Sequence, residues 1–181
     1  LHSFPTRRSS DLVFTRQWYT YAYGHGSGLK LHVDNRFDKI YDYWKCKGDF
    51  GSCMTGRNRD EFYAYSVNAK AAYITDEHDY IVARAILFTD VTDQHGKKWR
   101  LLERQYASNK DDTLKRLLID KLIHGEYIDG YKVIGASCSD ADAFVDISGN
   151  SLKNKKFEID CRLDIRDTLS YQDSFKWYNH S

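Results

Sequence analysis

The sequence predicts an α+β protein, with a mostly antiparallel sheet, one clear helix and a few short helices. Two observations support this class. Residues 71–106 contain the apolar runs AAYIT, DYIVARAILF and KWRLLERQYA, and polar turns separate these runs, as expected for an antiparallel meander. Residues 111–124 then place leucine and isoleucine at helical spacing after two aspartates. The meander and the helix together form the predicted core of the domain.

The remaining elements follow in order, with no internal repeat and no linker. Residues 36–44 carry apolar side chains at helical spacing, and Asp34 or Asn35 is a suitable cap for this helix. Carboxylates at the start of the 111–124 helix suit its dipole, and Gly125 is a suitable stop. Other expected elements are a strand over 29–33, a short helix over 61–67, and strands over 131–136, 143–147 and 156–165.

The hairpin within the meander predicts a buried charge. If Phe88 lies opposite Trp99, Arg84 lies opposite Glu103, and alternation places all four on one apolar face. An unpaired charge on such a face is costly, so we expect Arg84 and Glu103 to form a structural buried pair. The alternative is an arginine that is held ready for an anion.

Residues 1–12 are expected to lie outside the native protein. His2 to Leu12 resemble the translated end of a widely used short-read sequencing adapter, and they include Pro5, the only proline of the chain. We therefore expect a single α+β domain over 13–181. Its natural N-terminus is expected to be missing, and its C-terminus is a candidate truncation.

Composition limits the classes of function. The chain has 27 lysines and arginines against 26 aspartates and glutamates, which argues against both a strongly basic nucleic-acid module and an acidic DNA mimic. No apolar run approaches the roughly 20 residues that span a bilayer. Four cysteines scattered over 181 residues indicate reduced thiols in a cytosol and not a disulfide framework.

Several ordered sequence blocks carry a family resemblance. The blocks are GSCM (51–54), FYAY (62–65), ARAILF (83–88), ERQY (103–106) and YQDSFKWY (171–178). Together they resemble a family of uncharacterised proteins of tailed phages and prophages. The chain departs from that family at three positions. Glu103 replaces the usual aspartate, Gln105 replaces the usual aliphatic residue, and Ser170 replaces the usual proline. The resemblance implies a phage origin and the cytoplasm of a bacterial host, and it implies no mechanism.

The candidate catalytic residue is Cys53. It follows a glycine and a serine in an expected bend, where a base such as His25 or His32 could activate the thiol. A small buried residue at a tight turn is the alternative. The GHGSG stretch (24–28) precedes a strand and not a helix, so a flexible turn is favoured there over a phosphate loop.

Metal ligands are a weaker expectation. Cys46 and Cys53, with His25 and His32, do not have the usual zinc spacing. The weak candidates for a hard cation are Asp140, Asp142 and Asp146. Their loop lacks the glycine of a calcium loop, so solvated carboxylates are the default interpretation. We therefore expect no metal and no cofactor.

The candidate binding surface combines aromatic and basic side chains. Its residues are Trp18, Tyr21, Tyr41, Trp44, Lys45, Lys47, Arg57 and Arg59. Aromatic side chains interleaved with basic ones suit single-stranded nucleic acid or a protein partner. The alternative is that these rings fill the core.

The leading functional hypothesis is a phage-encoded accessory protein that binds a host protein or nucleic acid without catalysis, with interference in host defence as one form. A second hypothesis is a small enzyme that acts on nucleic acid or a nucleotide through an Asp/Glu-bound metal or Cys53. A third is a virion component. Binding predicts an exposed aromatic and basic patch, whereas an enzyme predicts several acids, or Cys53, converging in a cleft.

Overall fold

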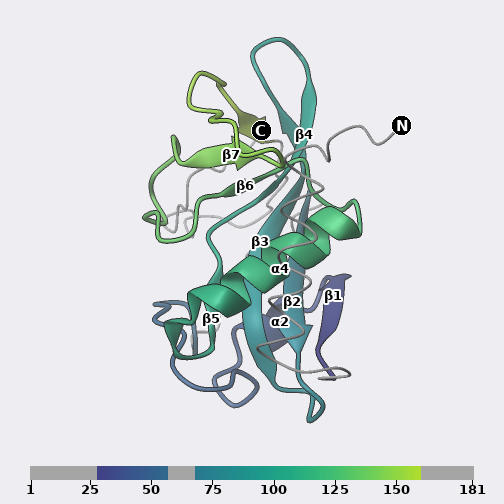
Figure 1. The fold of residues 1–181 in the computed structure, drawn as a ribbon, viewed down its shortest axis with the longest axis vertical. Helices are drawn as coiled ribbons and strands as arrows, with labels where there is room; N and C mark the ends of the chain where they lie inside the picture. The colour runs from purple at the N-terminus through teal and green to yellow at the C-terminus, as the bar shows by residue number, and fades with distance from the viewer. Residues whose placement is uncertain (1–27, 57–67, 160–181) are drawn as a thin grey trace, which may run out of the picture.

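The computed structural model describes residues 28–56 and 68–159, and it confirms the α+β class (Figure 1). One sheet has helices on its two faces. In chain order the elements are β1 (Lys30–Asp34), α2 (Phe37–Ile40), β2 (Ala69–Thr75), β3 (Ile81–Thr92), β4 (Lys98–Leu102), β5 (Tyr106–Ala107), the 3-10 turn η1 (Ser108–Lys110), α4 (Asp112–His124), β6 (Gly130–Lys132), β7 (Phe144–Asp146) and β8 (Glu158–Ile159). Within the described ranges, no helix is long and apolar enough to cross a membrane.

The sheet is mixed. Its strand order is β1-β2-β3-β4-β6-β7, and β5 and β8 each pair with the long strand β3. The antiparallel meander predicted over 71–106 is confirmed by the β2–β3 and β3–β4 pairs. The β4–β6 pair, by contrast, is parallel. A parallel pair requires a crossover connection, and α4 lies within that connection.

Helix α4 covers one face of the sheet, as Figure 1 shows. It begins where predicted, because the Asp111 carboxylate accepts a hydrogen bond from the Thr113 N–H at 2.8 Å, and it ends at Gly125. Its leucines and isoleucines pack against apolar side chains of β2, β3 and β4. This layer is an apolar core of the kind that the helical spacing predicted.

The opposite face is covered by α2 and by residues 41–56. Phe37, Ile40 and Phe50 pack there against Phe88 and Leu101 of the strands. The helix expected over 36–44 is shorter than predicted and ends at Ile40. Residues 41–46 instead form a turn, because the side chain of Asp42 accepts the Trp44 N–H at 2.9 Å and competes with helical hydrogen bonding.

The predicted register of the hairpin was wrong. Val91, and not Phe88, lies opposite Trp99, and Phe88 lies opposite Leu101. The Asp93 carboxylate accepts the backbone N–H groups of the turn that follows it, so β3 continues to Thr92 and the loop is shorter than expected. A bulge between Phe88 and Val91 then shifts the pairing back by one residue, so the final register still differs from the predicted one.

This register moves Arg84 and Glu103 apart along the strands. The Glu103 N–H donates to the Ile86 carbonyl at 2.8 Å, and Arg84 lies opposite Tyr106 of β5. The predicted direct opposition of Arg84 and Glu103 is therefore wrong. Both side chains are nevertheless buried, at 2% and 1% exposure, and both line one small pocket.

Candidate binding surface

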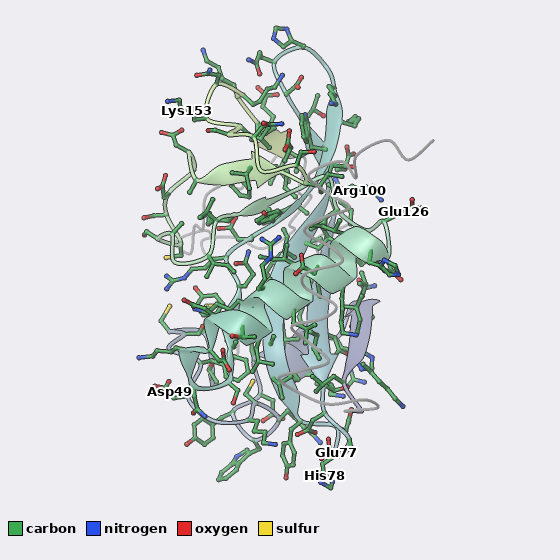
Figure 2. All side chains as sticks on the ribbon, viewed as in Figure 1. Asp49, Glu77, His78, Arg100, Glu126 and Lys153 are labelled. Atoms are coloured by element: carbon green, nitrogen blue, oxygen red, sulfur yellow. The ribbon has the colours of Figure 1, made fainter. Side chains whose placement is uncertain are left out.

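Part of the predicted surface forms one exposed end of the molecule, here called the aromatic tip: Tyr43, Trp44, Lys45, Lys47 and Tyr80. Backbone hydrogen bonds fasten its two segments together. The Ile81 N–H donates to the Lys45 carbonyl at 2.8 Å, and the Lys47 N–H donates to the Ile81 carbonyl at 2.9 Å. Figure 2 shows that Asp49, Glu77 and His78 lie at the same end as these segments.

The aromatic rings of the tip are unusually exposed. Trp44 is 81% exposed, Tyr43 64% and Tyr80 44%. The Tyr43 and Trp44 rings meet edge to face, with their centroids 5.4 Å apart. Tryptophan is highly buried on average, so an exposed tryptophan beside an exposed tyrosine exposes apolar area that a partner could cover.

The charges around the tip are balanced. Three nearby ion pairs join Lys47 to Asp76 at 3.1 Å, Lys39 to Asp79 at 2.8 Å and Lys110 to Asp49 at 3.7 Å. The hydrogen bond from Lys39 lowers the pKa of the Asp79 carboxyl, which keeps that carboxylate ionised at neutral pH. Lys45 is in none of these three pairs, but acidic side chains at this end match the basic ones among the described residues. The described part of the surface therefore lacks the excess of basic groups that binding to phosphates requires.

The structure divides the predicted surface residues into three groups. Trp44, Lys45 and Lys47 are exposed, as the binding surface requires. Tyr41 is 5% exposed and belongs to the core, because its ring packs against the Arg84 guanidinium at 4.9 Å. The remaining predicted residues, Trp18, Tyr21, Arg57 and Arg59, lie outside the described residues.

Buried charges lie on the face opposite α4. The Glu103 carboxylate accepts a hydrogen bond from the Lys132 ammonium at 2.6 Å, and Lys132 is fully buried. Lys132 also donates to the carbonyls of Ser137 and Cys138, at 3.2 and 2.9 Å. The cationic partner in the Glu103 ion pair is therefore a lysine 29 residues further along the chain. The sequence analysis missed Lys132, because only the parallel β4–β6 pairing brings it near Glu103.

Arg84 has different contacts. Its Nη2 donates to the Thr55 hydroxyl at 2.7 Å. Aromatic rings of Tyr41, Phe50 and Tyr106 surround its guanidinium, at 4.9, 5.5 and 5.1 Å from the ring centroids. Arg84 thus sits in an aromatic enclosure, where the Thr55 hydroxyl accepts one of its hydrogen bonds. Burial raises the pKa of the nearby Cys46 thiol, and the charge of Arg84 and a hydrogen bond from it oppose that rise.

The candidate cysteine Cys53 lies exposed in the turn after Gly51, so the expectation of a small buried residue at this turn was wrong about its burial. His32, one of the two bases considered for it, is committed elsewhere, because its Nε2 hydrogen-bonds the Thr75 hydroxyl at 2.7 Å and its ring stacks on Tyr73. Burial and the charge of Lys39 lower the pKa of His32. His25, the second base, lies outside the described residues.

The carboxylates considered for a metal have local roles. The Asp146 side chain accepts the N–H groups of Ser148 and Asn150, and Asp140 accepts the N–H of Asp142. The Asp140 and Asp146 carboxylates therefore each stabilise their own turn, and Asp142 contributes its backbone N–H to the first of these turns. Within residues 28–56 and 68–159, no group of three histidine, cysteine or acidic side chains is placed to hold a metal ion.

A histidine, threonine, tyrosine and aspartate cluster between β1 and β2 was missed by sequence reasoning. His32 bonds Thr75, and the Tyr73 hydroxyl donates to the Asp34 carboxylate at 2.8 Å. Burial, and the hydrogen bond to the Asp34 carboxylate, raise the pKa of Tyr73. Thr75 and Tyr73 are each 2% exposed, so a substrate could not reach either hydroxyl in this conformation. The cluster therefore has a structural role in this conformation. Sequence reasoning could have found it only by pairing the two strands in the correct register, which places His32 opposite Tyr73.

Comparisons with known proteins add no family. No protein-family model and no curated protein matches the chain. Among solved structures, a ribosomal-protein-alanine N-acetyltransferase from Brucella melitensis biovar Abortus 2308 is similar over 55% of this chain and 75% of that chain, at 15% identity and a TM-score of 0.35. A likeness of this size carries no argument about function.

Proposed function

We propose that this chain is a non-catalytic accessory protein that binds another protein through the aromatic tip. The observation that carries the proposal is the exposure of Trp44, at 81%, beside Tyr43. Tryptophan and tyrosine are enriched among the few interface residues that supply most of the binding energy. Both backbone segments of the tip are hydrogen-bonded to each other, so the rings project from a held framework.

The balance of charge favours a protein over a nucleic acid as the partner. Binding to a phosphate backbone draws most of its free energy from unpaired lysines and arginines, whereas Lys39 and Lys47 of this end are paired with carboxylates. Protein interfaces, in contrast, commonly have an aromatic centre with a polar rim of both signs. The aromatic tip, with exposed rings beside charges of both signs, matches this description of a protein interface.

The sequence resemblance to phage proteins suggests where the partner is found. On that basis we propose a phage-encoded protein that acts in the cytoplasm of its bacterial host on a host protein, with interference in host defence as one form. This part of the proposal rests on the GSCM, ARAILF and ERQY blocks and not on the tip.

Photo-crosslinking tests the proposal. A crosslinking residue is placed at position 44 or, as a control, at the 42% exposed Tyr127. Glu126, its neighbour, lies far along the molecule from Asp49 and Glu77 (Figure 2). A host protein captured from position 44 alone is then purified, and its affinity is measured by calorimetry.

Trp44→Ala is expected to weaken this affinity by about 30-fold, the loss of roughly 2 kcal/mol that an interface centre carries, whereas Tyr127→Ala leaves it unchanged. Equal losses in the two variants would contradict the proposal. Gel shifts with single- and double-stranded nucleic acid form the second arm. A nucleic-acid complex that Trp44→Ala abolishes would overturn the assignment to a protein partner.

A further inference from the structure

The small pocket at Arg84 is independent of the aromatic tip and has its own chemistry. Arg84 is 2% exposed, and its Nη2 donates to the Thr55 hydroxyl. No acceptor in the described part of the chain lies within hydrogen-bonding distance of its buried Nε. A buried guanidinium with an unused N–H is costly, so this group is suited to receive an acceptor from outside.

The rings around Arg84 do not replace that acceptor. Tyr41, Phe50 and Tyr106 stabilise the positive charge through their ring faces. Ring faces leave the in-plane N–H groups of a guanidinium without a strong acceptor. The enclosure therefore fixes the orientation of the arginine and leaves its directional hydrogen bonding incomplete.

The pocket carries positive charge. Arg104 also lines it, and its guanidinium packs on the Tyr106 ring at 5.1 Å, the same centroid distance as for Arg84. The carboxylate that lines the pocket, Glu103, is already bound at 2.6 Å by Lys132. Two guanidinium groups thus share a ring beside an acid that has its own cation. This arrangement favours an added anion.

Size decides which anion fits. A water-sized sphere can place its centre within only about 10 Å³ of the pocket, which is room for roughly one such group. A nucleotide cannot enter this space, and a tetrahedral phosphate fits it less well than the single leading oxygen of a planar carboxylate. The end of a planar carboxylate suits a guanidinium edge. Ser52, whose Oγ accepts the Met54 N–H at 3.2 Å, also lines the pocket.

We propose that this pocket binds a single carboxylate group, which accepts hydrogen bonds from the Arg84 guanidinium and is held by the charge of Arg104. A free small acid and an acidic side chain of another protein both carry this group, and the test below distinguishes these two sources. The proposal does not depend on the aromatic tip being a protein-binding surface.

An NMR titration tests the proposal directly by following the Nε–H signal of Arg84 in a nitrogen–proton correlation spectrum. The signal is identified by its loss in Arg84→Lys, or by through-bond assignment if that variant does not fold. Titration with sodium acetate at constant ionic strength is expected to move it to a saturating value. The matched internal control is the Nε–H of Arg100, which already donates to the Asp129 carboxylate at 3.0 Å and should not move.

Three further arms complete the test. Arg104→Gln is expected to weaken acetate binding about tenfold, the effect of one lost charge-assisted contact. A capped aspartate that binds at least tenfold more tightly than acetate identifies a protein side chain as the source, and equal or weaker binding identifies a free acid. Inorganic phosphate should give no saturating shift. A non-saturating shift with every carboxylate, or the same shift with chloride, overturns the proposal.

Discussion

On the α4 face of the sheet, apolar side chains of one helix pack on apolar side chains of the strands, and the buried Asp120 is paired within the helix by Arg116. The opposite face instead encloses charges whose partners lie on other elements. Leu118 and Leu122 are fully buried among other apolar residues. Across the sheet, Lys132, Glu103 and Arg84 are buried to the same degree. Any apolar neighbour satisfies a leucine, but a buried charge requires a particular partner. The two faces therefore differ in how strongly they depend on strand register.

The largest expected effect is on the charged face. Glu103→Gln leaves the buried Lys132 ammonium without its carboxylate, so we expect a loss of about 3–5 kcal/mol in the free energy of unfolding. Urea denaturation at neutral pH measures it. The matched control is Glu158→Gln, which removes an exposed carboxylate from β8 and should change stability by less than about 0.5 kcal/mol. Similar small effects in both variants would show that the pair does not organise this face.

On the apolar face, Leu118→Ala is expected to cost about 3 kcal/mol, because it leaves a cavity under α4. Its cost should not depend on pH, since no charge is involved. The same denaturation series at pH 5 and pH 8 checks this. A cost that changes by more than about 1 kcal/mol between these pH values would mean that the two faces are not as distinct as their composition indicates.

The Asp93 turn is expected to make a smaller contribution to stability. This contribution changes with pH only in the acid range. Hydrogen bonds from the Trp99 indole and from the N–H groups of His95 and Lys97 outweigh burial and lower the pKa of Asp93 to about 2. A folded pKa below the unfolded value, about 3.9, stabilises the protein above that value and loses this contribution as the pH falls to about 2. The stability gap between the native chain and Asp93→Asn should therefore be constant from pH 5 to 7 and shrink below pH 4. Thermal unfolding across this range measures the gap, and a gap that widens in acid would refute the assignment.

The smallest expected effect is at the start of α4. Asp111→Ala removes the acceptor for the Thr113 N–H and should cost about 1 kcal/mol. Asp112→Ala is the matched control: it removes a first-turn carboxylate that does not cap the helix and should cost less than half as much. Asp112 also pairs with Lys115 at 3.0 Å, so equal costs in thermal unfolding would show that first-turn charge, through the dipole and this pair, contributes as much as the cap.

Sequence reasoning succeeded where local pattern is sufficient. The α4 boundaries follow from Asp111, Gly125 and the spacing of leucines, and the meander follows from alternating apolar runs. It failed where a local side-chain hydrogen bond determines where a strand or a helix ends. Asp93 tightens the hairpin, and Asp42 ends the helix that apolar spacing extended to residue 44. Both are aspartates that bond a nearby backbone N–H, a signal that is present in the sequence but common to many turns.

The candidate site shows the same division. Exposure of Trp44, Lys45 and Lys47 agrees with the predicted surface, but the burial of Tyr41 does not. The interleaving of aromatic and basic residues cannot distinguish a ring that faces solvent from one that faces Arg84. Lys132 was not predicted as the partner of Glu103, because a parallel crossover pairing leaves no mark in the local pattern.

Two double-mutant cycles test most directly whether Glu103 forms its ion pair with Lys132, so that the Arg84 guanidinium remains available to bind an anion. One cycle combines Glu103→Gln with Lys132→Met, and the other combines Glu103→Gln with Arg84→Met, each measured by urea denaturation. The account predicts a coupling of at least about 2 kcal/mol with Lys132 and less than about 1 kcal/mol with Arg84. A larger coupling with Arg84 would contradict it.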